Sequence, residues 1–510
     1  MDPLREALRT HWGYSEFRPR QEEVVRAILG GRDVAVVMPT GGGKSLCYQL
    51  PAVVSGKTAV VVSPLIALME DQVAQLGQMG IPAAAIHSNS DWPTQLAAWR
   101  EADAGRLRLL YVSPERLALD SAAERLRRIP LGFFAIDEAH CISEWGHEFR
   151  PDYRRLGQLR DWFPEVPIAA FTASATRHVR GDIVNALGLD DPLKVVRSFH
   201  RSNLQYLVRN VDEPAKKKSK RLTRLQATLL ATLRDLEGES VIVYASKTAE
   251  VDTLGEWLTS KGIPSCMYHG KMDSSTRQQN QERWMADEAR VMVGTLAFGL
   301  GINKPGVRAV VHMALPKSVE QYYQEAGRAG RDGELAKCYL LWRKRDVALL
   351  VHFINEIQDP AERERGWQRY HTIKRFVEGR QCRHRFLCEY FGETPKWETC
   401  GACDVCLGLS EAVEEAIVEV AEETVKPVRT AKPRAATVAD LDQDLLTKLR
   451  NWRTRTAREK NLPAYVICHD QALTELCRRR PPSLAELLEV PGIGLKKAEK
   501  YGAELLALVN

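Results

Sequence analysis

The chain contains no long hydrophobic run, and every apolar stretch stays well short of the roughly 18 residues that suggest a membrane helix. Its first residues, Met1-Asp-Pro-Leu-Arg5, lack the apolar core of a signal peptide. We therefore expect neither export nor a membrane partner, and a cytoplasmic location is predicted. In a reducing compartment the 11 cysteines are not expected to form disulfides, so a cluster of them is a candidate metal site.

A strong excess of charge of one sign is also absent. The 72 basic and 66 acidic residues leave a formal net charge of +6, which permits a polyanionic partner but does not by itself indicate one. With 44% hydrophobic and 27% charged residues, the composition is that of a folded protein. The length of 510 residues exceeds what a single core supports and predicts about three or four domains.

A glycine-rich loop follows the first strongly apolar segment. Residues 34–38 predict a buried strand, and residues 46–50 can continue as a helix. The loop between them can surround anionic oxygens with its N–H groups, and its candidate nucleotide-binding residues are Thr40, Gly41, Gly42, Gly43, Lys44 and Ser45. In such a loop Lys44 reaches the terminal phosphates and Ser45 binds Mg²⁺. The first consensus position holds Met38 instead of glycine, and an ordinary strand-to-helix turn is the alternative.

Short apolar strands alternate with helical patterns along two stretches of the chain. This alternation predicts an α/β fold with two mostly parallel sheets covered by helices. The strands expected in the first lobe are residues 34–38, 59–63, 107–113, 133–137 and 167–172. Those expected in the second lobe are residues 240–246, 265–269, 290–294 and 309–313. Because a glycine loop occurs in the first lobe alone, we expect one nucleotide site for the two lobes, built across their interface.

Two adjacent carboxylates end the strand expected at residues 133–137. Asp137 can hold Mg²⁺ through water, and Glu138 is placed to orient and deprotonate a water molecule that attacks the γ-phosphate. An acidic pair at a strand end can also be a helix cap. Its position downstream of the glycine loop favours hydrolysis, with ATP and Mg²⁺ as cofactors.

A cluster of four cysteines follows the second lobe. Cys382, Cys400, Cys403 and Cys406 have the spacing C-x17-C-x2-C-x2-C. Four thiolates can enclose one tetrahedral Zn²⁺ and leave no open position, so a structural zinc site is predicted. A redox pair would need two cysteines only. Cys388 and His384 are further potential ligands that we rank below these four.

The glycine loop followed by Asp137-Glu-Ala-His140 resembles the superfamily 2 helicases, and further stretches resemble the RecQ DNA helicases in particular. Residues 12–24 are similar to the RecQ segment that recognises adenine. The resemblance implies that Gln21 reads the base edge and that Phe17 and Arg18 flank it. An amide can pair with adenine through two hydrogen bonds. The start of an amphipathic helix with a surface glutamine is the alternative.

Residues 141–153 are rich in aromatic and basic side chains and resemble the RecQ loop that links DNA contact to ATP hydrolysis. The resemblance implies that Trp145 and Phe149 stack on bases and that Arg150 contacts a phosphate. Two Ser-Pro segments, beginning at Ser63 and Ser113, are similar to other RecQ motifs. We expect them to expose hydroxyl and N–H groups to the DNA backbone, with simple strand-ending turns as the alternative.

The second lobe contributes residues 294–305 and 321–333, which also resemble helicase motifs. The resemblance implies that Arg328 and Arg331 complete the catalytic site when the lobes close. One of the two would neutralise charge on the transferred phosphoryl group, and the other would contact a phosphate or the first lobe. Surface arginines in salt bridges are the alternative.

We expect the chain to divide into a first lobe with the ATP site, 1–205; a second lobe, 206–345; a helical zinc-binding module, 346–407; a linker, 408–436; and a small all-α domain resembling the HRDC domain, 437–510. Large RecQ proteins carry a winged-helix domain after the zinc module. The linker is too short for it, so we expect this chain to lack the winged helix and its strand-separating wing.

The resemblance as a whole implies an ATP-dependent helicase that moves 3′-to-5′ on single-stranded DNA and unwinds tailed or branched duplexes in recombination and repair. The resemblance also suggests a single-stranded-DNA-binding protein as a partner. An RNA helicase, a translocase that remodels nucleoprotein and a non-catalytic scaffold are the alternatives. The aromatic loop and the zinc cluster favour DNA, and the intact Lys44, Asp137 and Glu138 disfavour a scaffold.

Overall fold

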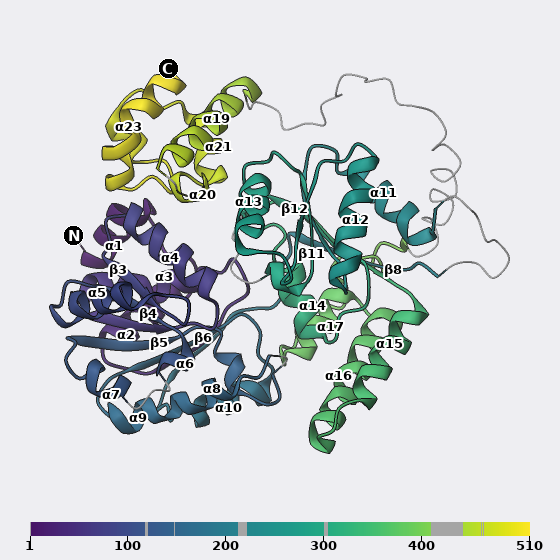
Figure 1. The fold of residues 1–510 in the computed structure, drawn as a ribbon, viewed down its shortest axis with the longest axis horizontal. Coiled ribbons are helices and arrows are strands. Elements are labelled where there is room, and N and C mark those ends of the chain that lie inside the picture. The colour runs from purple at the N-terminus through teal and green to yellow at the C-terminus, as the bar shows by residue number, and fades with distance from the viewer. Residues whose placement is uncertain are drawn as a thin grey trace. The chain divides into compact units, whose positions relative to one another are not determined.

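Two parallel sheets form the framework of the chain (Figure 1). The computed structural model describes residues 2–117, 121–146, 148–212, 222–299, 304–409, 442–460, 462 and 464–510. The linker expected at 408–436 lies outside the described residues from position 410 onward, as do residues 300–303 of the segment 294–305. The first sheet and the C-terminal helices form one compact unit, and the second sheet with the helices after it forms another. None of the described helices combines the length and apolar composition needed to cross a membrane.

The first sheet has seven strands in the order β3-β4-β2-β5-β6-β1-β7, and its pairings are parallel. Its strands are β1 (Val34–Val37), β2 (Thr58–Val62), β3 (Ala83–Ile86), β4 (Leu109–Val112), β5 (Leu131–Ile136), β6 (Ile168–Thr172) and β7 (Leu193–Val196). Its helices are α1 (Pro3–Ala7), η1 (Leu8–Trp12), α2 (Gln21–Leu29), α3 (Lys44–Ser55), α4 (Ile66–Gln78), α5 (Trp92–Asp103), α6 (Pro114–Leu117), α7 (Ser121–Leu126), η2 (Ala139–Ile142), α8 (Pro151–Arg154), η3 (Arg155–Gly157), α9 (Gln158–Trp162) and α10 (Arg177–Ala186).

The five strands expected in this lobe are all present, because central strands are buried on both faces and read as continuous apolar runs. The edge strands β3 and β7 were not expected. β7 carries the exposed Lys194 and Val196, so its apolar signal is interrupted. In this order β5, β6 and β1 are neighbours, and because the strands are parallel, their carboxyl ends lie side by side at one edge of the sheet.

The second sheet has six parallel strands in the order β10-β11-β9-β12-β13-β8. Its strands are β8 (Leu204–Asn210), β9 (Ser240–Tyr244), β10 (Ser265–Tyr268), β11 (Val291–Gly294), β12 (Val307–His312) and β13 (Ala336–Trp342). Its helices are α11 (Arg224–Asp235), α12 (Thr248–Ser260), α13 (Ser274–Met285), η4 (Leu296–Gly299) and α14 (Val319–Ala326). β8 and β13 were not expected, and β8 starts at Leu204, just before the lobe boundary proposed at 205.

Among residues 344–409, the described helices that follow the second sheet are α15 (Lys344–Asn355), α16 (Pro360–Glu378) and α17 (Arg383–Tyr390). A buried ion pair inside this module holds the aspartate that contacts the sheet. Arg383 donates to both carboxylate oxygens of Asp404, at 3.0 and 3.1 Å. Asp404 in turn accepts from the N–H of Val208 in β8 at 3.3 Å. The zinc module is therefore fixed to the edge strand of the second sheet.

In the last domain the described elements are all helices: α19 (Gln443–Glu459), α20 (Ala464–Ile467), α21 (Asp470–Arg479), α22 (Leu484–Leu487) and α23 (Leu495–Val509). It belongs to the same compact unit as the first sheet. The Tyr501 hydroxyl donates to the Gln78 side chain at 3.0 Å, and Arg9 pairs with Glu489. The all-α architecture expected for this domain is confirmed.

Candidate functional site

The glycine loop joins the end of β1 to the start of α3. Gly41 and Gly43 have positive φ values of 78° and 82°, which glycine adopts without steric cost. At Gly42 a side chain has no room, because a Cβ would lie 2.8 Å from the carbonyl oxygen of Pro39. Thr40 lies half buried before these glycines, and Ser45 is the second residue of α3. The loop and the helix N-terminus together form a suitable phosphate cradle.

Gln21, at the start of α2, holds this loop from the side. Its Nε2 donates to the Gly43 carbonyl at 3.0 Å, and its Oε1 accepts from the Arg18 N–H at 2.8 Å. One donor and one acceptor position of the amide remain for pairing with adenine. The Arg18 side chain reaches the Gly41 carbonyl, and Phe17 packs against the first-lobe core. The structure thus places the predicted adenine-binding segment beside the loop.

Arg197 is a loop contact that sequence reasoning missed. Its Nη1 donates to the Gly42 carbonyl at 3.4 Å. Burial lowers the pKa of Arg197, and the nearby charge of Arg18 lowers it further. Lys44 lies on the same loop, where its Nζ donates to the Met38 carbonyl at 3.2 Å. Several positive charges therefore gather around the loop, as a triphosphate requires.

The acidic pair follows β5 directly. Asp137 is 6% exposed, and its Oδ1 accepts from the Glu138 N–H at 3.0 Å. Glu138 has a positive φ of 47°, an uncommon backbone state that is often found at functional sites. Burial and the neighbouring Glu138 together raise the pKa of Asp137 to about 7, although Lys44 opposes the rise. Two adjacent carboxylates, one buried and one half buried, offer the oxygen ligands that suit Mg²⁺.

His140 connects the acidic pair to β6. Its Nδ1 lies 2.9 Å from Thr172 Oγ1 and 3.2 Å from Glu138 Oε2. Burial lowers the pKa of His140, but Cys141 and Glu138 outweigh this effect and raise it well above its usual value. The ring is therefore held between the ends of two neighbouring strands.

The aromatic loop presents two rings to solvent. Trp145 is 45% exposed and Phe149 is 37% exposed. The rings of Trp145 and His178 pack edge to face, with their centroids 4.9 Å apart. Arg150 instead points inward, where its Nη1 donates to the Pro64 carbonyl at 3.2 Å. The loop can offer stacking surfaces, but in this conformation its arginine contacts the protein.

The expectation of exposed hydroxyl groups at the two Ser-Pro segments is wrong. Ser63 is 1% exposed and Ser113 is 3% exposed. Their N–H groups extend the parallel sheet by one residue, since Ser63 donates to the Val112 carbonyl at 3.3 Å and Ser113 to the Ile86 carbonyl at 3.1 Å. Both serines complete strands instead of facing a ligand.

Arg328 and Arg331 follow α14 in the second lobe, where both are half buried. They lie near Tyr244 at the end of β9: burial raises the pKa of Tyr244 to about 12, and both guanidinium groups oppose this rise. Arg201 braces the turn by donating to the Gly330 carbonyl at 2.8 Å. The turn therefore presents both predicted arginines from a fixed backbone.

The four predicted zinc ligands, Cys382, Cys400, Cys403 and Cys406, come together in one cluster. The sulfur atoms of Cys400 and Cys406 lie 3.8 Å apart, which equals the edge of a tetrahedron with Zn–S bonds of about 2.3 Å. The N–H of Cys403 points at the Cys400 sulfur at 3.3 Å, as in a metal-binding turn. The cluster thus has the donors and the spacing of a structural zinc site.

Charge in this cluster also favours a cation. Hydrogen bonds from the thiols of Cys400 and Cys403 lower the pKa of Cys382 to about 3, whereas the same contacts raise the pKa of Cys400. One thiolate therefore forms readily, and further thiolates require a metal ion. Cys388 and His384 lie outside the cluster. His384 Nε2 donates to the Arg201 carbonyl at 3.1 Å, and burial lowers its pKa to about 4.

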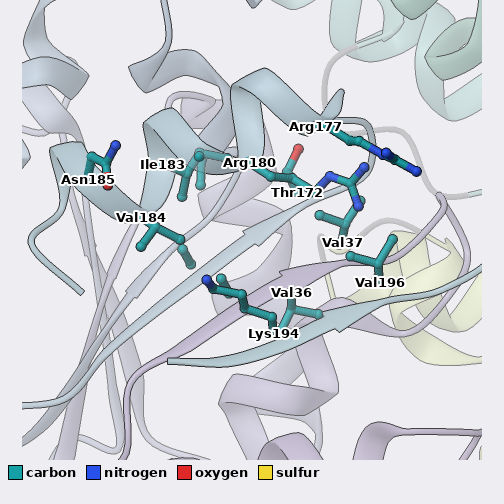
Figure 2. Close-up of a pocket in the computed structure, with 14 residues that line it drawn as sticks. Val36, Val37, Thr172, Arg177, Arg180, Ile183, Val184, Asn185, Lys194 and Val196 are labelled. Atoms are coloured by element: carbon teal, nitrogen blue, oxygen red, sulfur yellow. The ribbon is translucent and has the colours of Figure 1, made fainter. Parts of the chain in front are cut away.

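A separate cavity of about 460 Å³ lies between α10 and strands β1, β6 and β7 (Figure 2). Its lining is largely apolar, but Arg177, Arg180 and Lys194 also contribute to it. None of the predicted nucleotide-binding residues lines this cavity. It is therefore distinct from the glycine loop.

Family comparisons match the four parts of the chain in order: residues 18–181, DEAD/DEAH box helicase; 221–333, helicase conserved C-terminal domain; 344–407, RecQ zinc-binding; and 442–509, HRDC domain. The structure of Dbp5 from S. cerevisiae, bound to RNA and ADP BeF3, is similar with a TM-score of 0.53 and 15% identity, over 82% of this chain and 97% of that chain. That similarity concerns the fold alone. Fold, glycine loop and acidic pair together define an ATP-hydrolysing helicase with two parallel-sheet lobes.

Sequence relatives narrow this class. The ATP-dependent DNA helicase RecQ of Haemophilus influenzae is 33% identical over 99% of this chain and 95% of that protein. The RecQ of Bacillus subtilis is 31% identical over 96% of both chains. The chain belongs to the RecQ family of ATP-dependent DNA helicases, and the part that matches the RecQ zinc-binding family contains the four-cysteine cluster. The alignment with the Haemophilus protein spans 599 positions, whereas this chain has 510 residues. The Haemophilus protein therefore contains segments that this chain lacks.

Proposed function

We propose that this helicase translocates 3′-to-5′ on single-stranded DNA and unwinds tailed or branched duplexes during recombination and repair. The observation that carries the proposal is the convergence of Lys44 with the buried pair Asp137 and Glu138 at one edge of the first sheet. The polarity and the cellular role rest on the resemblance to RecQ proteins. Zinc-binding thiolates need a reducing environment, which supports a cytoplasmic location.

In the proposed reaction, the glycine loop and Lys44 bind the phosphates of ATP, and Gln21 and Arg18 position the adenine. Bound Mg²⁺, held by Ser45 and by Asp137 through water, would neutralise phosphate charge. Glu138 orients the attacking water and accepts its proton. Burial keeps the Asp137 carboxylate out of bulk water, which strengthens its interaction with a cation.

We further propose that Arg328 and Arg331 reach the γ-phosphate when the two lobes close on ATP. An arginine delivered in this way stabilises the transition state only in the closed form, so hydrolysis depends on lobe movement. The braced turn at Gly330 supports this role, because a fixed backbone delivers the guanidinium groups reproducibly. Alternating closure and opening would then move a bound strand through the enzyme.

DNA is proposed to stack on Trp145 and Phe149, whose exposed rings suit single-stranded bases without selecting a sequence. Arg150 would have to leave the Pro64 carbonyl to contact a phosphate. A single-stranded-DNA-binding protein is a proposed partner, since such proteins cover the strand on which the enzyme moves.

A second candidate function is translocation that remodels nucleoprotein without efficient strand separation. It is favoured by the short linker at 408–436, which leaves no room for the strand-separating winged helix, and the unmatched positions in the alignment with the Haemophilus relative are consistent with such a loss. The two functions differ in what happens to a duplex ahead of the enzyme.

Strand displacement from DNA and RNA duplexes with 3′ or 5′ tails tests the proposal. We expect ATP-dependent displacement of the DNA duplex with a 3′ tail. The matched inactive control is Glu138→Gln, which keeps the shape of the site but not the base. Displacement from 5′ tails only, or from RNA in preference to DNA, would refute the proposal. ATP-driven removal of a bound protein without displacement would select the second function.

A further inference from the structure

A second group of metal-binding side chains lies at the start of the aromatic loop. His140, Cys141 and Glu148 each offer one ligand atom, and all three atoms lie within 4.8 Å of one another. This group and the four-cysteine cluster are the ones that meet this criterion among the described residues. His140 and Cys141 are buried, whereas the Glu148 side chain is 23% exposed and provides access from solvent.

The distances approach those around a tetrahedral zinc ion. Cys141 Sγ lies 3.8 Å from His140 Nε2, which in turn lies 4.0 Å from Glu148 Oε2. Ideal bond lengths to zinc place a sulfur and a nitrogen ligand about 3.5 Å apart. The nitrogen and oxygen ligands should lie about 3.4 Å apart, so the partly exposed Glu148 carboxylate would have to move by about half an ångström or more to close the site. Three protein ligands leave a fourth position for water.

The other side of the imidazole is also arranged as in metal centres. Histidine ligands commonly donate their second ring N–H to a carboxylate or another polar group, which orients the ring and fixes its tautomer. His140 Nδ1 faces Thr172 Oγ1 at 2.9 Å and Glu138 Oε2 at 3.2 Å. Nε2 is thus the atom directed toward Cys141 and Glu148. This arrangement needs no change of ring orientation when a metal binds.

We propose that His140, Cys141 and Glu148 bind a thiophilic divalent cation such as Zn²⁺, and that this cation inhibits DNA-stimulated ATP hydrolysis. The ion would hold Glu148 against His140 and so immobilise the loop that carries Trp145. It would also fix the N–H of His140 toward Glu138, the proposed catalytic base. The binding site stands on geometry alone, whereas its effect on hydrolysis rests on the proposed roles of Glu138 and the aromatic loop.

The test measures zinc content and ATPase activity of the full chain after equilibration in buffers of increasing free zinc. We expect the wild type to bind two zinc ions, one per cluster, and Cys141→Ser and Glu148→Ala each to bind one. Each protein is compared with its own zinc-poor rate. Zinc should reduce DNA-stimulated ATPase in the wild type toward the DNA-independent rate, and should leave the rates of both variants nearly unchanged.

A matched control is Cys266→Ser, which removes another buried free cysteine, in β10 of the second lobe. It should retain the second zinc ion and the inhibition. Binding of only one zinc ion by the wild type would overturn the proposed site, as would a second ion retained by both variants. A second ion that is lost in the variants but does not alter ATPase would overturn the inhibition. A missing response to DNA at low zinc would instead count against the proposed function.

Discussion

Replacement of Asp137 by asparagine is expected to stabilise the magnesium-free protein at high pH and to abolish ATP hydrolysis. Asparagine has the same shape, and its Oδ1 can still accept from the Glu138 N–H. The substitution removes a buried charge that the site disfavours, because burial and the neighbouring Glu138 raise the pKa of Asp137 from its ordinary 3.8 to about 7. The folded protein therefore keeps a proton that the unfolded chain releases between pH 4 and 7.

The sign of the pH effect follows from this difference in bound protons. Because the folded state binds more protons, the free energy of unfolding of the wild type falls as pH rises from about 4 to 7. A shift of about three units corresponds to at most about 4 kcal/mol. The free energy of unfolding of the asparagine variant should not fall in this way, because asparagine does not titrate. With about 2–4 °C per kcal/mol for a domain of this size, its Tm should exceed that of the wild type by several degrees at pH 8 and by little near pH 4.

Thermal unfolding in magnesium-free buffer without free zinc, on protein that carries zinc in the four-cysteine cluster alone, measures this difference. Asp161→Asn, which removes an exposed carboxylate from α9 of the same lobe, is the control and should show no such pH dependence. The reasoning would be refuted by a Tm difference between Asp137→Asn and wild type that is the same at both pH values. A variant that is less stable than the wild type at pH 8 would refute it as well.

Three further substitutions test other parts of the site. Glu138→Gln should bind ATP but hydrolyse it at least about 10²-fold more slowly, since a general base is lost; normal turnover in an ATPase assay would exclude Glu138 as the base. Trp145→Ala should reduce DNA-stimulated ATPase more than basal ATPase, because a stacking surface is removed; an equal loss of both rates would contradict the coupling role. Cys403→Ser should lower both bound zinc, measured by metal analysis, and the Tm, since the metal stabilises the fold; an undiminished zinc content would contradict the ligand assignment.

The sequence could locate the glycine loop, the acidic pair and the cysteine cluster because each depends on neighbouring residues or a fixed spacing. Arg197 could not be found in this way. It reaches the loop because β7 pairs with β1, so that Val196 lies opposite Val37 and the next residue meets Gly42. Such a contact depends on the register between segments about 160 residues apart. β8 and β13 were not predicted for a related reason. They pair with each other at one edge of the second sheet, and that pairing also joins segments far apart in the sequence.

The inward contacts of the aromatic loop would link DNA, bound as proposed, to the proposed catalytic carboxylates. The Tyr153 hydroxyl donates to the main-chain carbonyl of Asp137 at 2.9 Å, and Arg150 donates to the Pro64 carbonyl at the end of β2. The loop therefore holds the backbone at the ends of two neighbouring strands while it exposes Trp145. A base that displaces Trp145 would act on these bonds, and hence on the backbone that carries Asp137 and Glu138. This route would be short, because the Tyr153 hydrogen bond joins the loop directly to the backbone of Asp137.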